Sequence, residues 1–129
     1  DQILYRHEDF WREINGHNLT KGWVESPSYV LSLFGEADIE ALTDYSHREI
    51  VRICKLYKPG TANYHLVEGS DHSMIKVGSM DDGAALRGTP EYFNYLQQRF
   101  NYSVVSIIDE WMQRVIPLHY PEQLPATQP

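Results

Sequence analysis

The sequence lacks the features that mark several protein classes. It has one cysteine, Cys54, among 129 residues, which excludes an internal disulfide framework and a cysteine-rich zinc module. Basic residues are also few, because 11 Lys and Arg stand against 18 Asp and Glu, for a formal net charge of −7. Binding to a nucleic-acid backbone needs a basic face, so we do not expect nucleic acid as the main partner.

Long hydrophobic runs and metal-binding patterns are missing as well. No apolar stretch approaches the roughly 20 residues that span a bilayer, so we expect no membrane span. The six histidines include no HExxH and no close His-x-His spacing, and we therefore expect no metal and no cofactor. Histidines such as His7, His17 and His47 are expected at the solvated surface.

The composition that is present suits one ordinary globular domain. Hydrophobic residues make up 42% of the chain and charged residues 22%, which is enough apolar material for a core. Residues 29–34 form a nearly continuous apolar run between Pro27 and Gly35, which predicts a buried strand. Residues 64–67 predict a second strand.

A helix is expected between these two strands. Apolar residues recur at helical spacing from Ile50 to Tyr57, several residues from Thr43 to Ser46 can cap its start, and Pro59-Gly60 ends it. Strand, helix and strand in this order predict parallel pairing. The fold class is therefore α/β, with helices packed on a parallel sheet.

The rest of the chain gives a coarser pattern. We expect helices over 3–14, 92–100 and 103–116, a connecting loop over 15–27, a long surface loop over 70–88, and an extended proline-rich tail over 117–129.

Two residues follow the predicted strands at places where chemistry concentrates. Asp38 lies four residues past Phe34, and His72 lies five past Val67. The carboxyl ends of parallel strands face one crevice, so the two side chains are expected to meet. An aspartate held against one imidazole nitrogen leaves the other free to take a proton from a nucleophile. Asp38 and His72 are thus two members of a catalytic triad in this interpretation.

These segments resemble the last portion of an α/β-hydrolase of the serine esterase or peptidase type. The stretch 30–38 reads VLSLFGEAD, and 64–74 reads YHLVEGSDHSM. In that family a strand ends in a Gly-x-x-Asp turn that supplies the acid, and the next strand ends in a short loop that supplies the histidine. The resemblance implies that Asp38 is the acid and His72 the base, with an ester or a peptide-like amide as substrate.

The chain also departs from that family. It has no Gly-x-Ser-x-Gly elbow before Asp38, since Ser26, Ser28 and Ser32 lack the flanking glycines. The resemblance thus implies a C-terminal part of a hydrolase that is inactive alone. Its divisions would be a lid-like helix and loop over 1–27, the segment with the acid and the histidine over 28–116, and the tail over 117–129.

Several alternatives stay open. Glu36 and Glu40 compete with Asp38 as the acid, while Asp38 could cap a helix and His72 could bond Asp71 or Ser73. A metal-dependent hydrolase would use His65, Asp71 and His72.

A different class is a non-catalytic α/β module that binds a partner or assembles with itself. Two parallel strands without neighbours leave edges open to pairing. We therefore expect self-association, or pairing with the missing N-terminal hydrolase portion.

Overall fold

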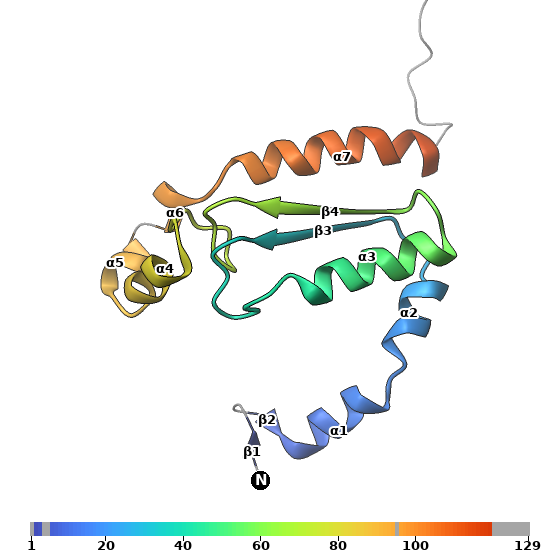
Figure 1. Ribbon diagram of the computed structural model, residues 1–129, viewed down its shortest axis with the longest axis horizontal. Helices are drawn as coiled ribbons and strands as arrows, with labels where there is room; N and C mark the ends of the chain where they lie inside the picture. The colour runs from blue at the N-terminus through green and yellow to red at the C-terminus, as the bar shows by residue number, and fades with distance from the viewer. Residues whose placement is uncertain (1, 4–5, 95, 120–129) are drawn as a thin grey trace, which may run out of the picture.

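Figure 1 shows the computed structural model of the chain, which describes residues 2–3, 6–94 and 96–119. Four strands and seven helices follow along the described residues. They are β1 (Gln2–Ile3), β2 (Arg6–His7), α1 (Glu8–Gly16), α2 (Leu19–Glu25), β3 (Val30–Gly35), α3 (Tyr45–Tyr57), β4 (Ala62–Val67), α4 (Met80–Arg87), α5 (Pro90–Asn94), α6 (Leu96–Arg99) and α7 (Ser103–His119).

The centre of the molecule is the pair of strands β3 and β4. They are parallel, in a register that runs from Val30 opposite Ala62 to Gly35 opposite Val67. Both predicted strands and their parallel pairing are confirmed, and the chain is a mixed α/β protein. Because the carboxyl ends of the two strands lie side by side, the segments that follow them leave the sheet at the same end.

Helix α3 packs across one face of this sheet. Its buried side chains Val51 and Cys54 form a core cluster with Ala62 of β4. Trp23 of α2 packs against the same cluster, so it contributes core area. Cys54 is free and fully buried. The amphipathic spacing that predicted this helix is thus used to cover the strands.

Helix α7 lies on the other side of the strand pair (Figure 1). The indole Nε1 of Trp111 donates to Oδ1 of Asn63 at 3.2 Å. Asn63 follows Ala62, and neighbouring residues of a strand point to opposite faces, so this contact lies opposite α3. Although α7 spans 17 residues, neither it nor another helix among the described residues is long and apolar enough to cross a membrane.

The N-terminal part differs from its prediction. Strands β1 and β2 pair antiparallel before α1, so the first helix begins at Glu8. The expected loop over 15–27 contains α2, whose start is capped by Asn18 through a 2.9 Å bond from the Lys21 amide to Oδ1. An asparagine side chain that accepts from the first helical turn stabilises the start of a helix. The polar composition of 15–27 favoured a loop instead.

Three further boundaries also differ. The expected loop over 70–88 contains α4, capped by the Ser79 hydroxyl, which accepts from the Asp82 amide at 3.1 Å. The helix expected over 92–100 is divided into α5 and α6, and Pro90 occupies the first position of α5. Helix α7 continues through Pro117 to His119, and residues 120–129 of the predicted tail lie outside the described residues.

Candidate functional site

Asp38 lies in the turn directly after β3. The turn is closed by the Asp38 amide, which donates to the carbonyl of Gly35 at 3.0 Å. The side chain of Asp38 is only 3% exposed. Oδ1 accepts from the amides of Glu40 at 2.7 Å and Ala41 at 3.0 Å. These two bonds fix the carboxylate and leave Oδ2 for another donor.

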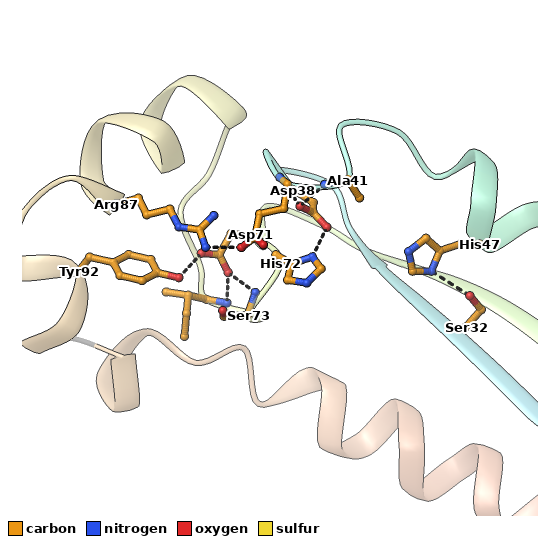
Figure 2. Close-up of polar contacts among 11 residues, drawn as sticks. Ser32, Asp38, Ala41, His47, Asp71, His72, Ser73, Arg87 and Tyr92 are labelled. Atoms are coloured by element: carbon orange, nitrogen blue, oxygen red, sulfur yellow. Dashed lines mark hydrogen bonds and ion pairs between the residues drawn. The ribbon is translucent and has the colours of Figure 1, made fainter. Parts of the chain in front are cut away.

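His72 supplies that donor from the loop after β4. Its Nδ1 lies 2.8 Å from Oδ2 of Asp38, the contact expected from the sequence (Figure 2). Since an ionised carboxylate can only accept, Nδ1 carries the proton and Nε2 of the neutral ring carries a lone pair. The imidazole is 54% exposed, and Nε2 has no hydrogen-bond partner among the described residues. The buried acid thus orients a base that is open to an incoming group.

The electrostatics of the pair follow from this geometry. The hydrogen bond to Asp38 raises the pKa of His72 above its ordinary value, against a smaller opposing effect of burial. Burial alone would raise the pKa of Asp38, but hydrogen bonds from the Ala41 amide, the His72 ring and the Glu40 amide together hold it below its ordinary value. Asp38 therefore stays ionised while His72 is a stronger base than a free imidazole.

The two loops are held together by their backbones. The Ala37 amide donates to the carbonyl of Ser70 at 2.8 Å. A Cβ added at Gly35 would lie 2.4 Å from the carbonyl oxygen of Asp71 and 2.5 Å from that of Ser70. Only a glycine allows this approach. The end of β3 and the segment 68–79 between β4 and α4, called the histidine loop below, therefore form one packed unit.

Neither competing glutamate takes the place of Asp38. Oε2 of Glu36 accepts from the Gly69 amide at 2.9 Å. Glu40 forms an ion pair with Arg87 at the end of α4. Both contacts join the acid turn to the chain that follows β4, so the glutamates help to hold the two loops in place.

The residues named for a metal site do not come together as one. Asp71 is buried, His65 is exposed on β4, and His72 bonds Asp38. Within the described ranges, no group of three or more His, Cys, Asp and Glu side chains could hold a metal ion. The geometry thus favours proton transfer by the Asp38–His72 pair over metal binding at these three residues.

A contact between a serine and a histidine outside the Asp38–His72 pair was not expected. The ring of His47 on α3 is half-buried, so its predicted place at the solvated surface is wrong. Its Nδ1 lies 2.9 Å from Oγ of buried Ser32 on β3, and its ring lies 5.3 Å from that of Phe34. Figure 2 shows this pair apart from Asp38 and His72. It joins α3 to β3, and no sequence pattern indicated it.

Sequence reasoning also missed the polar groups that support the histidine loop. Asp71 binds the phenol of Tyr92, 21 residues away. Asn101 donates from Nδ2 to Oγ of Ser70 at 2.9 Å, in a buried contact. Such pairs join loops far apart along the chain, so no local spacing in the sequence reveals them.

Comparisons of the chain with protein-family models, with curated proteins and with solved structures give no significant match.

Proposed function

We propose that this chain carries the acid and the base of a serine hydrolase of the α/β-hydrolase type. The observation that supports the proposal is the buried Asp38 bound to the exposed His72 at the ends of two parallel strands. The order of strand, acid turn, helix, strand and histidine loop is similar to the C-terminal part of that fold. The substrate class is an ester or a peptide-like amide.

Each residue has a distinct role in the proposed mechanism. Nε2 of His72 takes the proton of a serine hydroxyl as its oxygen attacks the carbonyl carbon of the substrate. The imidazolium then gives this proton to the leaving alcohol or amine as the bond to that group breaks. The acyl group of the substrate is then bound to the serine. A water molecule gives a proton to His72 as its oxygen attacks the acyl carbon, and His72 returns the proton to the serine oxygen as the carboxylic acid product leaves. Asp38 keeps Nδ1 protonated and stabilises the positive ring throughout.

The attacking serine belongs to another part of the fold in this proposal. Ser32, the serine of β3, is buried and bonded to His47. It lies in the strand, without the sharp turn that presents a nucleophile in this type of enzyme. The hydroxyl would approach His72 from its exposed side, where Nε2 is open.

A labelling experiment tests the proposal. The full reading frame that contains this sequence is expressed and treated with a fluorophosphonate probe, which reacts with activated serines. We expect covalent labelling of one serine, and a loss of at least about 1000-fold in labelling rate for His72→Ala. Asp38→Asn should also slow the reaction, because it removes the charge that stabilises the imidazolium.

His65→Ala is the matched control, because it removes an exposed histidine from β4, the strand that precedes the histidine loop. It should label at the rate of the unmodified protein. Labelling that is equally fast in His72→Ala would refute the role given to His72, and an absence of labelling in the full protein would refute the hydrolase function.

A non-catalytic module that assembles with itself is the second candidate. The observation in its favour is a stripe of exposed apolar residues along α7, at spacings of three and four. Its members are Val105, Ile108, Met112 and Ile116. Contiguous apolar surface of this kind marks interaction sites. The labelling experiment separates the two candidates, because an assembly module has no activated serine.

A further inference from the structure

Asp71, the residue before His72, is a buried carboxylate that the proposed mechanism does not use. It is 5% exposed. Its Oδ1 accepts from the amides of Ser73 and Ile75, both at 2.9 Å. Its Oδ2 accepts from the phenol of Tyr92 at 2.8 Å (Figure 2). Both carboxylate oxygens are thus occupied by donors that lie beyond His72 in the sequence.

These bonds close a tight loop around His72. The Asp71 amide donates to the carbonyl of Ile75, and the Met74 amide donates to the carbonyl of Asp71, both at 3.0 Å. Met74 has a φ of 60°, a left-handed conformation that costs a non-glycine residue free energy. The surrounding bonds must maintain this conformation. The carboxylate of Asp71 therefore helps to set the backbone angles from which the imidazole projects.

Tyr92 connects this loop to α5. Its side chain is buried, with 5% of the residue exposed. Burial is the main cause that raises the pKa of Tyr92 above its ordinary value. The phenol therefore keeps its proton, and donates to Asp71, over the pH range in which a histidine titrates. The other side of the loop is held by β3, through the close approach at Gly35.

We propose that Asp71 and Tyr92 are positioning residues that hold the imidazole of His72 against Asp38, an inference that rests on the proposed function for its catalytic meaning. The loop is held at the end of β3 by its backbone, at Ser70 by Asn101 and at Asp71 by the phenol of Tyr92. Removing the Tyr92 hydroxyl leaves the first two contacts intact and releases the carboxylate next to His72. A base displaced by about 1 Å loses much of its effectiveness, so such a support matters for proton transfer.

The test measures the imidazole itself. The titration of His72 and the resonance of its Nδ1 proton are followed by NMR in the chain and in Tyr92→Phe, a change that removes one hydroxyl and no charge. We expect the pKa of His72 to fall by about 0.5 unit, a part of the roughly 1 to 3 units by which a full carboxylate contact shifts a pKa. The Nδ1 proton should also exchange faster with water.

Tyr64→Phe is the matched control. Tyr64 donates to Oδ2 of Asp44 at 2.7 Å, so this variant also breaks a tyrosine–aspartate bond, but away from the histidine loop. It should lower the thermal midpoint and leave the titration of His72 unchanged. A titration of His72 in Tyr92→Phe that coincides with that of Tyr64→Phe would show that Tyr92 is only structural and overturn the proposal.

Asp71→Asn keeps the test decisive if Tyr92→Phe does not fold. Asparagine has nearly the same shape, and the Nδ1 proton resonance reports the bond between His72 and Asp38 directly. Faster exchange of this proton supports the proposal, and an unchanged resonance overturns it. Neither measurement uses turnover, so a failure to label with fluorophosphonate would refute the hydrolase function and leave the positioning result standing.

Discussion

The Asp38–His72 pair is asymmetric in its surroundings. The carboxylate is 3% exposed and the imidazole 54% exposed. Burial of the carboxylate strengthens each of its hydrogen bonds, because water does not screen them. Exposure of the ring lets protons reach Nε2 from solvent or substrate. A buried carboxylate beside an exposed imidazole is the arrangement that the proposed proton transfer to and from a third group requires.

This pair should make stability depend on pH. The pKa of His72 is raised in the folded chain above 6.5, so its contribution is fully present below that value and is lost as the pH rises through the folded pKa. The pKa of Asp38 is lowered below 3.8, so its contribution is present above that value and is lost as the pH falls through the folded pKa. We expect His72→Gln to lower the free energy of unfolding more at about pH 5.5 than at about pH 8.5.

Urea unfolding at the two pH values measures this difference. His65→Gln, which changes an exposed histidine of β4, gives the control for losing any histidine. The same pH profile in both variants would contradict a specific contribution of His72. The difference should be small, because the ring is half exposed and solvent screens its charge.

At this scale the sequence predicts the contact between Asp38 and His72 but not the polar groups around it. Asp38 and His72 follow two parallel strands, and the geometry of such sheets brings strand ends together whatever the rest of the fold. The contact between Asp71 and Tyr92 depends instead on where α5 packs. That position follows from tertiary packing, which no local pattern around either residue encodes.

Among the elements, the junction between β3 and the histidine loop is the most tightly packed part of the site. Gly35→Ala would place a methyl group 2.4 Å from a backbone oxygen that cannot rotate away. We expect the variant to lose about 3 kcal/mol in its free energy of unfolding, the upper part of the usual range for overpacking. The NMR titration of His72 should shift as well, because the loop must move.

Gly22→Ala is the matched control for this substitution. Gly22 lies inside α2, and an added Cβ meets nothing within 4 Å. Alanine is the better helix former by about 1 kcal/mol, so this variant should be as stable as the unmodified chain or more so. Equal effects of the two substitutions in urea unfolding would contradict the packing argument.

The helices show which local signals are strong enough to predict an element. The predicted helix between the strands is present as α3, because its apolar spacing matches the face that it buries. Helix α4 was missed because Gly83 and two aspartates suggested a loop, although Ser79 was a usable cap signal. Gly83 is buried against Val77, so its small size serves packing.

For the whole molecule, the open surfaces predict association. Each strand of the central sheet has one neighbouring strand among the described residues, and unpaired strand edges favour pairing with another chain. The apolar stripe of α7 adds exposed surface, with Met112 43% exposed. We expect light scattering to show a mass above that of one 15.0 kDa chain.

A charge placed in the stripe should weaken this association. Met112→Glu is expected to raise the dissociation constant by about tenfold or more, because a carboxylate would have to lose its hydration at the contact. Ser106→Glu adds the same charge at an exposed polar position of the same helix and should change the dissociation constant little. A monodisperse monomer for the unmodified chain would contradict the prediction.

The turn between α3 and β4 lies at the start of β4, at the opposite end of the strand from the segment that carries His72 (Figure 1). Gly60, with a φ of 85°, is exposed there, and an added side chain would meet open space. Six residues of β4 separate this turn from the histidine loop, a length of about 20 Å. A tether or a spectroscopic label attached by insertion beside Gly60 would hold the molecule by the end of β4 that is farther from His72, which suits immobilisation on a sensor surface.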